Sequence, residues 1–198
     1  MAGRRPAAFV DRDDTLNRDC PYCRRPEDIV LLPTVAEGVR LLNEARVPVI
    51  VVTNQSGVGR GYFTETDLRD MHAKLQADLA AAGARVDAFY HCPHLPDSGC
   101  PDRKPAPGLI LRAAVELGLD PQRSAVIGDR VLDMELARRV GARAVMVPSA
   151  RGKVELATAS APPDFVARDF VSAARWVIAN LPRDAPDASS PGNPREKA

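Results

Sequence analysis

The sequence lacks any long apolar stretch. Near its start only the four residues 7–10 are consecutively apolar, whereas the core of a secretory signal needs roughly 7–15 such residues. Nowhere does an apolar run approach the ~20 residues of a membrane-spanning helix. We therefore expect no signal peptide, no membrane segment and a cytoplasmic protein.

The sequence also lacks an excess of charge of either sign, and it has little cysteine. Its 27 basic and 26 acidic residues leave a net charge of +1, which gives no general attraction for nucleic acid or anionic membrane. Only four cysteines are present. In a reducing compartment we do not expect these cysteines to form disulfides, and metal binding is the role to consider instead.

What the sequence does contain is typical of a soluble globular protein. Hydrophobic residues make up 45% and charged residues 27% of its 198 residues, enough for one domain with a proper core. Short apolar runs that predict buried strands alternate with longer helical patterns. The strand-like runs cover residues 7–11, 47–54, 86–92, 124–129 and 142–148, and the helical patterns cover 35–45, 64–82, 107–117 and 132–140.

This alternation predicts an α/β fold, a three-layer sandwich in which helices cover both faces of a mostly parallel central sheet. Thr64 and Asp67 have the spacing of an N-terminal capping box, and Gly83 follows the end of the same helix. We expect a single domain over residues 1–181, with residues 182–198 disordered because they are rich in Pro, Asp and Ser. In such folds ligands bind beyond the carboxyl ends of the strands.

Carboxylates lie at two of these strand ends. Asp11 and Asp13 follow the first run, and residues two apart in an extended segment face the same side. Asp129 follows the run at 124–129, and Asp133 lies one helical turn later. Carboxylates that share a site repel one another unless a cation neutralises them, and oxygen ligands suit Mg²⁺.

Two further polar segments fit a phosphoryl site. Thr53 follows an apolar run and precedes a glycine-containing loop whose N–H groups can bind oxyanions, and Lys104 stands just before a predicted helix. Taken singly, each of these residues is explained as well by a helix cap or a turn. All of them in this order, each at a strand end, favour a phosphoryl-transfer site over that structural explanation.

These residues resemble the four motifs of the haloacid dehalogenase-like superfamily of phosphotransferases. Its motifs are Asp-x-Asp-x-Thr, Thr or Ser, Lys, and Gly-Asp-x-x-x-Asp. The matching residues here are Asp11, Asp13, Thr15, Thr53, Lys104, Gly128, Asp129 and Asp133. The resemblance implies that Asp11 is the nucleophile and becomes phosphorylated, while Asp13 acts as acid and base.

The same resemblance implies a magnesium site and a substrate-stabilising pair. Mg²⁺ would be held by Asp11, the Asp13 carbonyl and Asp129, with Asp133 in the outer shell. Thr53 and Lys104 would neutralise the transferring oxygens. The gaps between the motifs are too short for a large cap domain, so we expect an open site.

A cysteine- and histidine-containing loop over residues 92–102 narrows the resemblance to two groups of capless members. Histidinol-phosphate phosphatases and heptose 1,7-bisphosphate 7-phosphatases carry a zinc loop of the form Cys-x-His…Cys-x-Cys-Arg-Lys-Pro. Cys92, His94 and Cys100 match it, but Asp102 stands where those families have cysteine. Asp102, a water or a thiol from Cys20 or Cys23 could complete a Zn²⁺ site, or no zinc binds. Taken alone, Cys20 and Cys23 are interpreted as loop residues.

The segment after the first motif looks like that of the heptose phosphatases. By that analogy the substrate contacts are Asp19, Cys20, Pro21, Tyr22, Thr53, Asn54, Gln55, Ser56, Arg103, Lys104 and Arg130. Arg103 is the candidate for a second, non-reacting phosphate. Three positions depart from the family: Asp14 replaces Gly, Cys20-Pro21 replaces x-Gly, and Arg130 replaces Lys.

We therefore expect a magnesium-dependent phosphatase that acts on a small phosphorylated molecule and functions as a monomer. A heptose 1,7-bisphosphate is the first candidate substrate, and histidinol phosphate or another small phosphomonoester is the second. Two alternatives come from other classes, a non-catalytic protein that keeps the fold and a zinc-binding interaction domain. The first predicts loss of a motif residue, and every motif residue is present.

Overall fold

The computed structural model describes residues 4–20, 22–157 and 162–182. Its strands are β1 (Ala8–Val10), β2 (Val49–Asn54), β3 (Ala88–Cys92), β4 (Ala125–Gly128), β5 (Arg143–Met146) and β6 (Phe165–Val166). Its helices are α1 (Val35–Glu44), α2 (Ser56–Gly59), α3 (Glu65–Ala81), α4 (Gly108–Leu117), α5 (Val131–Val140), α6 (Ala150–Leu156) and α7 (Phe170–Asn180). The predicted strands and helices are all present, and each is slightly shorter than its sequence pattern except α5, which begins one residue earlier.

The six strands form one sheet in the order β3-β2-β1-β4-β5-β6, and every neighbouring pair is parallel. Val10 of β1 lies opposite Val51 of β2 and Ile127 of β4. This register brings the carboxyl ends of the three central strands to the same edge of the sheet. The α/β prediction is confirmed, and the sheet is parallel throughout the described residues.

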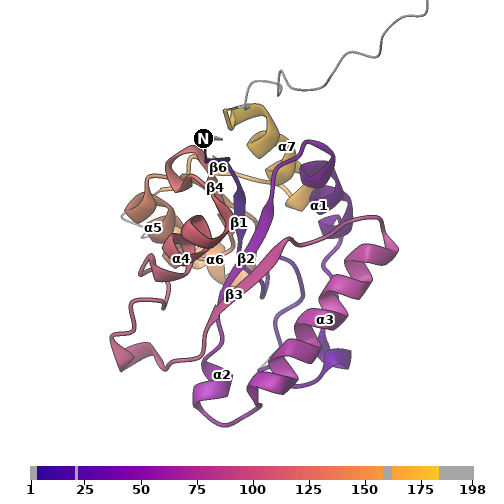
Figure 1. The fold of residues 1–198 in the computed structure, drawn as a ribbon, viewed down its shortest axis with the longest axis vertical. Coiled ribbons are helices and arrows are strands. Elements are labelled where there is room, and N and C mark those ends of the chain that lie inside the picture. The colour runs from indigo at the N-terminus through magenta and orange to yellow at the C-terminus, as the bar shows by residue number, and fades with distance from the viewer. Residues whose placement is uncertain (1–3, 21, 158–161, 183–198) are drawn as a thin grey trace, which may run out of the picture.

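Helices cover both faces of the sheet, as Figure 1 shows for α1, α3 and α7 on one side and α4 and α5 on the other. The first group packs on inward side chains that include Ala8 and Val10, and the second packs on a separate cluster that includes Phe9. Successive β1 residues therefore face opposite layers, because side chains alternate along a strand. Both layers are apolar, which explains why the strands read as continuous hydrophobic runs.

Local sequence signals set the helix ends. Thr64 accepts a hydrogen bond from the Asp67 amide at 3.1 Å, and the Asp67 carboxylate accepts one from the Thr64 amide at 2.7 Å. This is the predicted capping box at the start of α3. Gly118 and Gly141 end α4 and α5 with φ angles of 65° and 72°, a left-handed conformation that glycine adopts without steric cost.

The segments that could have formed a cap domain instead belong to the sheet layers. Between β2 and Lys104 the described chain holds α2, α3, β3 and a short 3-10 helix (Pro96–Ser98), and α3 packs against the sheet. No helix in the described part of the chain is long and apolar enough to cross a membrane. The predicted disordered tail lies, from residue 183 onward, outside the described residues.

Candidate active site

The carboxyl edge of the sheet brings together the side chains that the four motifs predicted. Asp11 directly follows β1, Thr53 lies near the end of β2, and Asp129 directly follows β4. The loop before α4 supplies Lys104, and the first turn of α5 supplies Asp133. All five are buried, with relative exposures between 0% and 8%, so their charges and hydroxyl group have little access to bulk water.

Lys104 connects two of these carboxylates. Its Nζ lies 2.5 Å from Asp11 Oδ1 and 2.7 Å from Asp133 Oδ1. Burial alone would lower the pKa of Lys104, but the two aspartates raise it above its ordinary value. The lysine is therefore charged at neutral pH and holds the Asp11 carboxylate in one position.

Asp11, Asp129 and Asp133 form a cluster in which one carboxylate oxygen from each lies within 4.8 Å of the others. Burial, offset in part by Lys104 and reinforced by the neighbouring carboxylates, raises the pKa of Asp11 to about 7. Burial also raises the pKa of Asp129 to about 6; a hydrogen bond from Ser149 opposes the shift and Asp133 adds to it. One lysine does not neutralise three buried carboxylates. The donor set, all carboxylate oxygen, fits Mg²⁺.

Asp13 lies outside this cluster and has a hydrogen-bond shell of its own. Arg12 approaches it side-on, with Nε 2.9 Å from Oδ1 and Nη2 2.9 Å from Oδ2. Asn17 and Gln55 donate to the same carboxylate at 3.0 and 2.8 Å. Burial alone would raise the pKa of Asp13, but the Arg12 charge and these hydrogen bonds hold it below its usual value. The shell fixes the orientation of this side chain.

The loops after β2 and before α4 are joined by direct contacts. Asn54 donates from Nδ2 to the Lys104 carbonyl at 3.1 Å and accepts from the Lys104 amide at 3.0 Å. Gln55 Nε2 donates to Thr53 Oγ1 at 3.0 Å as well as to Asp13. Asn54 and Gln55, predicted as substrate contacts, therefore also position the catalytic candidates.

Two adjoining cavities open at this edge. The inner cavity, about 130 Å³, is lined by Asp11, Asp13, Asp14, Asp19, Thr53, Asn54, Lys104, Asp129, Arg130, Leu132 and Arg151. The outer cavity, about 400 Å³, is lined by other predicted contacts as well, namely Cys20, Tyr22, Gln55, Ser56 and Arg103. Every described residue predicted to contact substrate thus lines one cavity or both. Pro21 lies outside the described residues.

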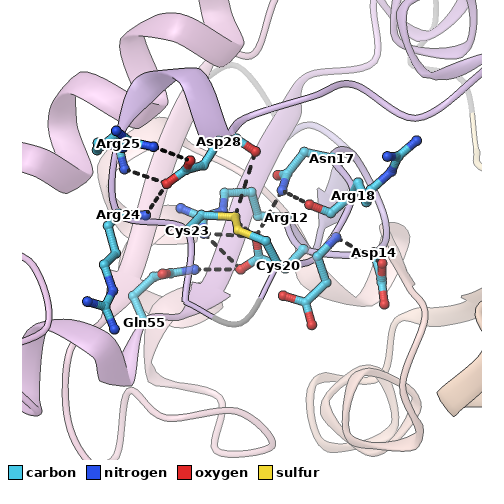
Figure 2. Close-up of a disulfide and its surroundings, with 12 residues drawn as sticks. Arg12, Asp14, Asn17, Arg18, Cys20, Cys23, Arg24, Arg25, Asp28 and Gln55 are labelled. Atoms are coloured by element: carbon cyan, nitrogen blue, oxygen red, sulfur yellow. Dashed lines mark hydrogen bonds and ion pairs between the residues drawn. A yellow bond between two sulfur atoms is a disulfide. The ribbon is translucent and has the colours of Figure 1, made fainter.

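The loop at the outer cavity contains a disulfide between Cys20 and Cys23 (Figure 2). The expectation that the cysteines stay unpaired is wrong for these two, because their Cα atoms lie 5.4 Å apart, within the range that a disulfide bridges. The pairing also removes both thiols as candidates for a fourth zinc ligand. Cys23 is buried, and both cysteines line the outer cavity together with Arg12.

The second candidate metal site lies at the end of β3. Cys92 Sγ is 3.6 Å from His94 Nδ1 and 3.7 Å from Cys100 Sγ, and the three ligand atoms lie within 4.8 Å of one another. Burial and the Cys100 thiol raise the pKa of Cys92 to about 11, although the His94 amide opposes the shift. Two sulfurs and an imidazole fit Zn²⁺.

Asp102, one of the candidates for a fourth zinc ligand, is not brought to this cluster. Its Oδ2 lies 3.0 Å from Arg112 Nη1 of α4, and it is absent from the group of described ligand atoms around Cys92. The negative charge of the Asp102 carboxylate is attracted to the Arg112 guanidinium. A neutral cysteine thiol at this position would not be. The structure therefore offers three protein ligands.

Comparisons with known proteins agree with this geometry. A family model described as HAD-hydrolase-like matches residues 102–173. A D-glycero-D-manno-heptose-1,7-bisphosphate 7-phosphatase of Thermosynechococcus vestitus is 38% identical over 191 residues, covering 89% of this chain and 97% of that protein. A D-glycero-beta-D-manno-heptose-1,7-bisphosphate 7-phosphatase of Rhodopseudomonas palustris is 42% identical over 147 residues, covering 71% and 82%. This chain belongs to the haloacid dehalogenase-like family of hydrolases.

The solved structures support the same assignment. A D,D-heptose 1,7-bisphosphate phosphatase from B. bronchiseptica, complexed with magnesium and phosphate, superposes with a TM-score of 0.82 at 31% identity and covers 88% of this chain and 98% of its own. The family resemblance inferred from the motifs is confirmed, and the protein is a phosphatase of this family.

One departure from the family pattern has a local explanation. Asp14 stands where these phosphatases usually have glycine, and its φ angle is 55°, in the left-handed region. Aspartate and asparagine tolerate this region better than most residues. The Asp14 carboxylate also accepts a hydrogen bond from the Asp19 amide at 3.0 Å, which ties the first motif to the substrate loop.

The structure adds residues that the motifs did not identify. Arg12 is 2% exposed and pairs with Asp13; its place between two motif aspartates was the available signal. Glu155 pairs with Arg130 at 2.5 Å, and Arg151 lines both cavities. Nothing in the local sequence marks Glu155 or Arg151, because α6 reaches the site only through tertiary packing.

Proposed function

We propose that this phosphatase removes the C7 phosphate of D-glycero-D-manno-heptose 1,7-bisphosphate through a phosphorylated Asp11. The observation that carries the proposal is the Lys104 ammonium held between Asp11 and Asp133, at a carboxylate cluster that faces the inner cavity. The names of relatives that are 38% and 42% identical support the choice of substrate.

In the first half of the reaction, an Asp11 carboxylate oxygen attacks phosphorus and the bond from phosphorus to the C7 oxygen breaks. Asp13 reacts in its protonated form and donates that proton to the leaving alkoxide. In the second half, Asp13 takes a proton from water, whose oxygen attacks phosphorus and displaces the Asp11 carboxylate. Inorganic phosphate is released and Asp11 is regenerated.

The residues around these two aspartates stabilise the transferring phosphoryl group. Lys104 and Thr53 face the transferring phosphoryl oxygens and offset their charge. Asp11, Asp129 and the Asp13 backbone carbonyl would hold Mg²⁺, with Asp133 next to them. When bound, this ion supplies positive charge that offsets the repulsion between the Asp11 carboxylate and the incoming dianion.

We further propose that Cys92, His94 and Cys100 bind Zn²⁺, which would fix the loop that leads into Arg103 and Lys104. The soft donor set and the short separations of the three ligand atoms support this site. The cytoplasmic location and the monomeric state stay predictions from the sequence.

A phosphate-release assay with Mg²⁺ tests the proposal. We expect heptose 1,7-bisphosphate to be hydrolysed with a kcat/KM at least about tenfold above that of histidinol phosphate, and the Asp11→Asn variant to lose all measurable turnover because it lacks the nucleophilic carboxylate. A preference for histidinol phosphate would contradict the substrate, and an active Asp11→Asn variant would contradict the chemistry.

A further inference from the structure

Helix α6 is fixed against the active site by its first residues. The Ser149 hydroxyl accepts a hydrogen bond from the Gly152 amide at 2.8 Å, and it also bonds to the Asp129 side chain. A Cβ at Gly152 would lie 1.9 Å from the Asp129 carbonyl oxygen. Only glycine therefore lets the α6 backbone approach Asp129 this closely.

This anchoring places Arg151 at the boundary between the two cavities. It lines the inner cavity together with Asp11 and the outer cavity together with Arg103. Its side chain is 68% exposed, so its guanidinium remains accessible to a ligand. The residue thus lies within reach of a substrate whose reacting end is at Asp11.

Of the three cationic side chains that line the inner cavity, Arg151 forms the longest ion pair within the described chain. Lys104 is held by Asp11 and Asp133, and Arg130 by Glu155 at 2.5 Å. Within the described chain, the ion pair recorded for Arg151 is a longer one, with Nε 3.5 Å from Glu155.

Glu155 connects the two arginines. Its carboxylate accepts two hydrogen bonds from Arg130 Nε, at 2.7 and 2.8 Å, and one from the Val131 amide at 3.2 Å. Two guanidinium groups thus share one carboxylate, so Arg130, Arg151 and Glu155 together carry one positive charge, and Asp19 is a further acidic group on which the Arg151 charge acts. A second anionic group would be attracted there.

We propose that Arg151 is a specificity-determining residue, which binds the non-reacting phosphate of a sugar bisphosphate. The inference rests on the proposed function, since it assigns the second phosphate of that substrate. Arg103, the arginine expected from the family resemblance, donates from Nη1 to the His94 carbonyl at 2.8 Å and lines only the outer cavity. Arg130 and Arg151 both line the two cavities, but Arg130 is held by Glu155 at 2.5 Å, whereas the Arg151 pair with the same carboxylate is longer.

The test compares two substrates that share the reacting phosphate, heptose 1,7-bisphosphate and heptose 7-phosphate. For Arg151→Ala we expect KM for the bisphosphate to rise about tenfold with kcat within about twofold of wild type, because a charge-assisted contact to the second phosphate is lost. KM for the monophosphate should change by less than about twofold. Arg151→Lys should recover part of the loss.

Arg175→Ala is the matched control. Arg175 lies on α7, is also 68% exposed, and forms a similarly long pair with Glu37 at 3.9 Å. We expect this variant to behave as wild type with both substrates, and the melting temperatures of all variants to show that they are folded.

The outcomes separate the inference from the function on which it rests. If wild type hydrolyses the bisphosphate and Arg151→Ala weakens both substrates equally or neither, the inference is wrong and the proposed function stands. Wild type that releases no phosphate from the bisphosphate overturns the proposed function and the inference with it. A KM increase confined to the bisphosphate supports both.

Discussion

The centre around Asp11 and the loop around Cys92 both gather potential metal ligands, but they draw them from very different distances along the chain. Lys104 pairs with Asp11 across 93 positions and with Asp133 across 29, whereas Cys92 meets His94 and Cys100 across 2 and 8. The centre needs the ends of β1 and β4 and the loop before α4 to come together. The loop needs one strand end and a short turn.

The two regions also differ in burial and in how the charges of their side chains are balanced. At the centre, Lys104 is 4% exposed and holds two carboxylates that are also buried. In the loop, Cys100 and His94 have partial exposure or more, and the position expected to close the site pairs elsewhere. Removing one group from the centre should therefore leave buried charges unpaired, while a change in the loop should act on metal binding.

The largest effect is expected for Lys104→Met, which tests the compensation at the centre. Removing one partner from a buried ion pair costs about 3–5 kcal/mol, and here the loss leaves Asp11 and Asp133 unpaired. We expect the free energy of unfolding, measured with denaturant, to fall by about this amount without added metal.

Lys74→Met is the control for that measurement. Lys74 forms a similarly short pair with Asp78, 2.6 Å away, but its side chain is 40% exposed. Exposed pairs of this kind contribute less than about 1 kcal/mol. If both variants lose the same free energy of unfolding, the buried ion pairs of Lys104 contribute no more to stability than an exposed pair.

The next largest effect is expected from adding a fourth ligand to the candidate zinc site of Cys92, His94 and Cys100. Asp102→Cys supplies a thiol that has no attraction for Arg112, so it can close a four-ligand site as structural zinc sites prefer. We expect the variant to bind Zn²⁺ roughly ten- to a hundredfold more tightly than wild type in competition with a metal indicator, which corresponds to about 1.4–2.8 kcal/mol.

Asp97→Cys adds a thiol to the same loop and is the matched control. Asp97 is exposed in the 3-10 helix Pro96–Ser98, outside the Cys92 cluster, so we expect little change in affinity. If both variants tighten zinc binding equally, the position of residue 102 has no special role.

The smallest effect is expected at a buried group that lacks a partner. His72 stacks on Phe89 with ring centroids 4.5 Å apart, and its Nε2 has no hydrogen-bond partner among the described residues. Burial, with smaller contributions from Arg12 and His91, lowers the pKa of His72 to about 3. The folded protein therefore holds this imidazole neutral.

This shift has a defined pH dependence. Between about pH 6.5 and pH 3 the unfolded chain binds a proton at His72 that the folded chain does not, so stability falls as the pH falls below 6.5. At pH 5.5 the penalty is about 1.4 kcal/mol. We expect His72→Leu to be more stable relative to wild type at pH 5.5 than at pH 8 by about this amount; an identical difference at both pH values would contradict the assignment.

Much of the centre was predictable from local sequence. Apolar runs that end in Asp11, Thr53 and Asp129 predicted three strand ends, and parallel strands place those ends at one edge. Thr64, Asp67 and Gly83 predicted helix ends through hydrogen bonds and backbone conformations that involve only neighbouring residues. Because these signals act within a few residues, they can be recognised before the chain is folded.

The Cys20–Cys23 pair and the position of Asp102 were harder to predict. A Cys-x-x-Cys spacing is compatible with free thiols, metal ligands or a disulfide, and only the conformation of the loop favours one of them. Asp102 stands two positions after Cys100 and so looked like a ligand. Its carboxylate instead meets Arg112, which a turn of α4 brings toward it.

The sequence by itself determined the alternating strands and helices, their ends, and which acidic side chains follow which strand, because periodicity and capping depend on neighbouring residues. Only the tertiary structure decided that Lys104 lies between Asp11 and Asp133, and that α6 brings Arg151 beside them. Those contacts join segments far apart in the chain. They exist because sheet register and close packing, such as Gly152 against the Asp129 carbonyl, fix the distances between segments.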